Sequence, residues 1–182
     1  MSLQVERLEH NMAKLTIEVP AEEVEKALQA AYLKERGIMV GAEDGDMMLD
    51  SGLTRTELAV LLARITVKPE YLEAEQKLYI RACRFTDVPN WAQVYVGFCN
   101  YNGLMAGYGG GVFGAGDPVT SAAGCTVVLR YLGYTESDWD YSSACSKLVS
   151  LGLAPSEFIT KQVLTRGDMA ILLYRALHSE NA

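Results

Sequence analysis

The chain has 182 residues, of which 49% are hydrophobic and 21% charged, so it is long enough to bury a substantial core. The net charge of −7 and the pI near 4.9 argue against nucleic acid as a partner, because such a surface repels a phosphate backbone. No stretch has the apolar length of a membrane span or of a signal peptide. As the sequence stands, we therefore expect no membrane insertion and a cytoplasmic location.

The N-terminal segment alternates apolar and polar residues. Residues 3–8 and 13–19 carry the alternation and the residues between them favour a turn, so a small β-hairpin is predicted within residues 1–20. Residues 21–36 are predicted to form a helix, with acids in the first turn and basic residues in the last. Gly37 is expected to end this helix. Its expected apolar face consists of Val24, Leu28, Ala31 and Tyr32.

An internal repeat organises the rest of the chain. Three strings align on a glycine, a threonine and an arginine, and the arginine follows the threonine by ten positions in each. The glycine precedes the threonine by seventeen positions in the first two strings, and the third string is shorter by four. The three sets are Gly37, Thr54 and Arg64; Gly103, Thr120 and Arg130; and Gly152, Thr165 and Arg175.

Each unit is predicted to contain a helix, an irregular loop, a threonine N-cap and a second, apolar helix. Thr54 and Thr165 precede an acid by three positions, which is the pattern of a capping box, whereas Thr120 keeps the cap alone. Because the second helices are apolar nearly all round, we expect them to form the core. The predicted divisions are a hairpin at 1–20, repeats at 21–67, 85–134 and 135–178, and a linking helix at 68–84.

The string FTDVPNWAQVYVGFCNYNGLMAGYGGGVFGAGDPVT resembles an S-layer homology repeat, a bacterial module. The resemblance implies a mainly α fold in which three degenerate helix-loop-helix repeats form a pseudo-threefold spindle. It also implies a non-catalytic module without a cofactor, which binds pyruvylated secondary cell-wall polysaccharide in grooves between repeats at the cell surface after export. The matching positions are Phe85, Asp87, Val88, Trp91, Ala92, Gly103, Gly107, Tyr108, Gly111, Phe113 and Thr120.

The same resemblance implies particular ligand contacts. Arg55 and Arg166 would contact an anionic group, and Trp91 and Asp87 would lie near one groove. The second repeat departs from the pattern, because Ser121 stands where the other two have arginine. For the arginines, exposure to solvent or pairing with a neighbouring acid is the alternative, and for Trp91 it is sealing an edge of the core.

The N-terminal residues MSLQVERLEHNMAKLTIEVPAEEVEKALQAAYLKE are similar to the start of trigger factor, a ribosome-associated chaperone. That family's ribosome-contacting loop is absent, since the chain continues as ERGIMVGAEDGD. Two alternatives to wall binding therefore remain: an intracellular structural or protein-interaction module that has lost its glycan, and a ribosome-associated chaperone fragment. The sequence assigns no oligomeric state.

No catalytic or metal-binding constellation is predicted. His10 and His178 fall in a predicted turn and a tail, and neither is near a nucleophile pattern. The acids between Glu43 and Asp50 lack the spacing of a calcium loop. The glycine-rich run after Gly107 lacks the lysine of a phosphate-binding loop and is expected to serve positive φ angles. The four cysteines are expected to be buried or half-buried thiols.

Overall fold

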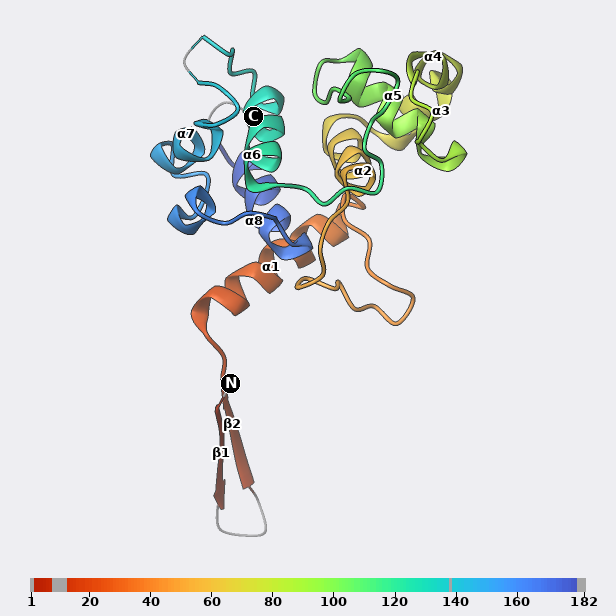
Figure 1. Ribbon diagram of the computed structural model, residues 1–182. Coiled ribbons are helices and arrows are strands. Elements are labelled where there is room, and N and C mark those ends of the chain that lie inside the picture. Colours follow the sequence, from red (N-terminus) through yellow and green to blue (C-terminus); the bar gives the residue numbers. More distant parts are fainter. Residues whose placement is uncertain (1, 8–12, 138, 180–182) are drawn as a thin grey trace.

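The computed structural model describes residues 2–7, 13–137 and 139–179, and this part of the chain is mainly helical (Figure 1). Its helices enclose one continuous cluster of buried hydrophobic side chains. The α-helices are α1 (Ala21–Glu35), α2 (Arg55–Thr66), α3 (Pro69–Ala74), α4 (Gln76–Ala82), α5 (Gln93–Tyr101), α6 (Ser121–Tyr131), α7 (Ala144–Ser150) and α8 (Arg166–Leu177).

Two strands precede the helices. β1 (Ser2–Arg7) and β2 (Ala13–Glu18) pair antiparallel, with Ser2 opposite Glu18 and Arg7 opposite Ala13. The turn predicted between them falls on residues 8–12, which lie outside the described residues.

Helix α1 begins where predicted and ends one residue earlier, at Glu35, but most of the face expected to be buried is exposed. Val24 and Leu28 are 44% and 66% exposed, whereas Gln29, Ala30 and Leu33 are buried. The predicted face was wrong for Val24, Leu28 and Ala31, whereas Tyr32 is half-buried against the core. Because α1 packs against α8, the side turned toward α8 determines which residues are buried. Local hydrophobicity alone does not identify that side.

The three predicted caps are confirmed. The hydroxyl oxygens of Thr54, Thr120 and Thr165 accept hydrogen bonds from the backbone N–H three residues on, at the starts of α2, α6 and α8. Glu57 and Asp168 complete capping boxes in the first and third cases. The helices that follow are largely buried, as their apolar sequences predicted.

The leading helix of each predicted repeat packs against the capped helix of another predicted repeat. Helix α5 lies on α2, α7 lies on α6, and α1 lies on α8, so the N-terminal helix contacts the last one in the chain (Figure 1). The residues just before the caps are buried and linked, since Val119 N–H donates to the Leu53 carbonyl at 2.8 Å and Leu164 N–H donates to that of Val119 at 2.9 Å.

The remaining elements depart from the predicted boundaries. Residues 68–84 form two short helices, α3 and α4, instead of one, because the chain turns at Glu75. A 3-10 turn at Asn90–Ala92 contains Trp91, and the leading α-helix of the second predicted repeat begins after it, at Gln93. A second short 3-10 helix, Ser156–Ile159, precedes the third cap.

The cysteine side chains are buried or half-buried, as expected. Cys99, Cys125 and Cys145 are buried and Cys83 is partly exposed. Desolvation raises the pKa of the Cys99 thiol, which lies 3.4 Å from the Ala59 carbonyl oxygen. A thiol in such surroundings stays protonated and packs as a small hydrophobic side chain.

Candidate functional site

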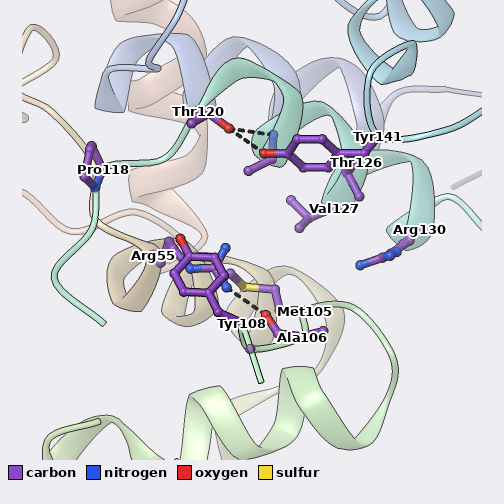
Figure 2. A pocket seen from close by; sticks show the side chains of 12 residues that line it. Arg55, Met105, Ala106, Tyr108, Pro118, Thr120, Thr126, Val127, Arg130 and Tyr141 are labelled. Carbon is purple, nitrogen blue, oxygen red and sulfur yellow. Dashed lines mark hydrogen bonds between the residues drawn. The ribbon is translucent and has the colours of Figure 1, made fainter. Parts of the chain in front are cut away.

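A groove of about 360 Å³ lies between the loop of the second repeat and the capped helix α6 (Figure 2). At one end, the hydroxyls of Thr120 and Tyr141 are joined by a hydrogen bond of 2.8 Å. The groove combines aromatic rings, hydroxyls and guanidinium groups, which is a surface suited to a polar ligand with an apolar face. Its lining residues are Arg55, Met105, Ala106, Gly107, Tyr108, Pro118, Thr120, Ala123, Thr126, Val127, Arg130 and Tyr141.

Arg55 comes from the first turn of α2 and binds the loop that forms one wall of this groove. Its Nε donates to the Phe113 carbonyl at 3.0 Å and its Nη2 to the Ala106 carbonyl at 2.7 Å. The guanidinium carbon lies 4.7 Å from the centre of the Tyr108 ring and 4.8 Å from that of Phe113. With 8% of the residue exposed, Arg55 holds the loop in shape by charge-assisted hydrogen bonds.

Arg166 repeats this arrangement at the start of α8. Its Nε donates to the Met47 carbonyl at 3.0 Å and its Nη2 to the Val40 carbonyl at 2.8 Å, so it holds the loop of the first repeat. In the second repeat the position belongs to Ser121, whose backbone N–H donates to the Gln162 carbonyl at 3.0 Å. The buried Ser121 hydroxyl has no hydrogen-bond partner among the described residues.

Asp87 organises the glycine-rich loop from the other side. Its carboxylate accepts hydrogen bonds from the backbone N–H groups of Phe113 at 2.8 Å, Gly114 at 2.7 Å and Ala115 at 3.0 Å. Desolvation pushes the pKa of Asp87 upward, but the backbone donors outweigh it and hold the pKa below the usual value. Gly114 has a φ of 77°, so the turn that presents these N–H groups favours glycine, as predicted for this run.

A second groove, of about 720 Å³, lies between the loop of the first repeat and the start of α5. Trp91 is 62% exposed here, one helical turn from Tyr95. Trp139, the other tryptophan of the chain, precedes α7 and is 6% exposed, so it belongs to the core. The exposed side chain of Trp91 therefore does not support the alternative in which it seals an edge of the core. The groove is lined by Gly37, Val40, Arg64, Val67, Pro69, Leu72, Glu73, Gln76, Trp91, Val94 and Tyr95.

The four residues expected to contact a ligand do not meet in one place. Arg55 lines the first groove and Trp91 lines the second. Arg166 and Asp87 lie outside the lining of both, and each holds backbone of a groove-forming loop. Arg166 contacts the wall of the second groove indirectly, because it donates to the carbonyl of Val40, and Val40 lines that groove.

The sequence carried a signal for two further groove residues. Arg64 and Arg130 each stand ten positions after a capping threonine, in the last turn of α2 and α6, and each lines one groove. Their spacing aligned the predicted repeats, but neither arginine was among the predicted ligand contacts. In a helix, the residue ten positions after the N-cap lies nearly three turns along the axis. The constant spacing therefore puts Arg64 and Arg130 at the same distance from their N-caps.

The described residues 2–7, 13–137 and 139–179 include no cluster of three or more His, Cys, Asp or Glu side chains with the proximity that a metal ion needs. None of the helices in the same ranges combines the length and the apolar character that crossing a membrane requires.

Comparison with known proteins supports two resemblances. Residues 84–122 match the family model of the S-layer homology domain. The chain is 29% identical over 154 residues to a cell surface protein of Thermoanaerobacter kivui and 30% identical over 150 residues to the middle cell wall protein of Brevibacillus brevis. These alignments cover 83% and 80% of this chain but 20% and 14% of the relatives.

The N-terminus matches a different protein. Over 36 residues it is 75% identical to trigger factor of Agathobacter rectalis, which covers 20% of this chain and 8% of that relative. The predicted similarity of the first residues to trigger factor is thereby confirmed. The chain thus spans a small part of each of these relatives.

Proposed function

We propose that this chain, which carries an S-layer homology domain at residues 84–122, is a non-catalytic module that binds acidic polysaccharide of the bacterial cell wall. Its three repeats would form the pseudo-threefold spindle of that family, and the exported protein would act at the cell surface. The observation that carries the proposal is the pair of grooves, each of which is lined by aromatic rings and by an arginine from the end of a capped helix.

The chemistry of the grooves suits an anionic sugar. Tyr108 and Trp91 are 63% and 62% exposed, and flat aromatic faces of this kind can cover the apolar face of a sugar ring. Arg130 and Arg64 lie in the same two grooves, where a guanidinium can bind a carboxylate through two N–H groups. Because the net charge is −7, an acidic polymer is repelled at long range and local cations must supply the attraction.

The residues that the resemblance named then divide into two roles. Trp91 contacts the sugar in the second groove, whereas Arg55, which lines the first, is a positioning residue because its Nε and Nη2 donate to loop carbonyls. Arg166 and Asp87 are positioning residues, because their polar atoms are engaged with backbone groups of the loops. In this proposal, loss of any positioning residue weakens binding by disordering a groove wall.

The test is binding of the purified chain to isolated cell-wall sacculi before and after removal of their secondary polymers. We expect sedimentation with intact sacculi, loss of binding after extraction, and release by salt because the contacts are ionic. Arg64→Gln and Arg130→Gln should each weaken binding. Arg81→Gln is the matched control, since Arg81 is an exposed arginine outside both grooves.

The main alternative is a protein-interaction module that has lost its glycan. The match to trigger factor supports this alternative, because the matched segment includes α1, which packs on α8. Part of the helical fold is therefore similar to a protein that is not a cell-wall protein. A folded parent chain that does not bind intact sacculi at low salt contradicts glycan binding and favours this alternative.

A further inference from the structure

Three arginines lie at equivalent positions of the capped helices, but in the described part of the chain only two of them form an ion pair with a carboxylate. Arg64, Arg130 and Arg175 each lie in the last turn of a capped helix, ten positions after the threonine. Arg130 is paired with Glu136, and Arg175 with Glu25 at 3.3 Å. The side chain of Arg64 has neither a hydrogen bond nor an ion pair among the described residues.

The pairing at Arg130 uses the donors that a ligand carboxylate requires. Its Nε and Nη2 both donate to Oε1 of Glu136, at 3.0 and 2.5 Å. The two side chains are 30% and 56% exposed, and Arg130 lines the first groove, so the pair is accessible to solvent and can open without unfolding the helix. A carboxylate approaching the same edge of the guanidinium would have to displace Glu136.

The second groove has no equivalent obstacle. Glu73 lines it together with Arg64, but the two side chains do not form an ion pair. A ligand carboxylate can therefore bind the guanidinium of Arg64 without first displacing a carboxylate of the chain, as it must at Arg130.

We propose that Glu136 is an internal competitor for the acidic ligand of the first groove, so that the second groove, with Arg64, is the one occupied first. This inference rests on the proposed glycan binding and adds the order in which the grooves fill. Exposed ion pairs contribute about 0.2–1 kcal/mol, so displacing Glu136 lowers the affinity of the first groove by about 1.4- to 5-fold.

The experiment isolates the first groove by using the full chain with Arg64→Gln as background. Glu136→Gln keeps the size of the side chain and removes its charge. The probe is a pyruvylated oligosaccharide released from the wall polymer, and calorimetry gives its Kd at low ionic strength. We expect Glu136→Gln to bind about 1.4- to 5-fold more tightly than the background alone, and the gain to shrink with added salt.

Two controls separate competition from a structural effect of the substitution. Glu25→Gln removes the carboxylate paired with Arg175, outside the first groove, and should leave the Kd unchanged. The same oligosaccharide after removal of its pyruvate should bind equally to the background and to Glu136→Gln. Because the pair is exposed, thermal unfolding should be nearly the same in both proteins.

Each result decides the proposal. If Glu136→Gln binds the pyruvylated probe no more tightly than the Arg64→Gln background does, Glu136 does not compete with the ligand. The same conclusion follows if Glu136→Gln raises the affinity for the probe without pyruvate by as much as the affinity for the pyruvylated probe. If neither the parent nor the variants bind the acidic probe, glycan binding itself fails and the competition fails with it. If the parent binds and Arg64→Gln leaves its affinity unchanged, the proposed order of filling is wrong.

Discussion

Replacing Arg55 by Met should destabilise the fold by an amount that its contacts define. Met keeps an apolar stem of similar length but removes the two hydrogen bonds to the Phe113 and Ala106 carbonyls. Hydrogen bonds from a charged donor contribute about 1.5–3 kcal/mol each, and Arg55 is 8% exposed, so solvent replaces them poorly. Taking the lower value for both bonds, we expect a loss of about 3 kcal/mol in the free energy of unfolding.

The measurement is thermal and urea unfolding followed by far-ultraviolet circular dichroism. For a chain of this size, about 1 kcal/mol corresponds to roughly 2–4 °C, so the Tm should fall by roughly 6–12 °C. The control is Arg64→Met in the same helix, because Arg64 has no polar partner among the described residues. Its stability should stay within about 0.5 kcal/mol of the parent.

Equal stability of Arg55→Met and Arg64→Met would refute the reasoning. It would mean that the loop carbonyls find water or other donors at no cost, so that Arg55 is free to serve a ligand alone. A large loss in Arg55→Met together with normal sacculus binding would show instead that the loop shape is not needed for recognition.

Three further predictions concern other parts of the fold. Thr54→Ala should cost about 1 kcal/mol in urea unfolding through loss of the N-cap, and an unchanged midpoint would contradict the cap. Gly97→Ala should cost about 1–3 kcal/mol by the same assay, because a Cβ there collides with the Tyr79 carbonyl where α5 meets α4. The lowered pKa of Asp87 stabilises the fold above its unfolded value near 3.8, and this contribution is lost as pH falls through the lower folded pKa. Acid unfolding of Asp87→Asn should lack that component, whereas an acid transition identical to the parent's would contradict it.

The sequence by itself determined the features that depend on neighbouring residues. The caps at Thr54 and Thr165 follow from a hydroxyl and an acid three residues apart, which form their hydrogen bonds within one helical turn. Positive φ angles in the glycine-rich loop follow from residues without a Cβ. The constant spacing between threonine and arginine predicted that Arg64, Arg130 and Arg175 lie at equivalent positions of three capped helices, because helix geometry converts a fixed spacing into a fixed position.

Tertiary structure decided what each repeated residue contacts. Arg55 and Arg166 bind carbonyls 51 and 126 positions away, and no local pattern specifies partners so distant. Both tryptophans precede a leading helix, yet Trp91 lines a groove and Trp139 is buried in the core. The exposed face of α1 likewise depends on α8, which lies at the other end of the chain. Whether a residue is buried depends on the element that packs against it. A sequence pattern therefore shows which residues can be buried, and the tertiary fold determines which of these residues are buried.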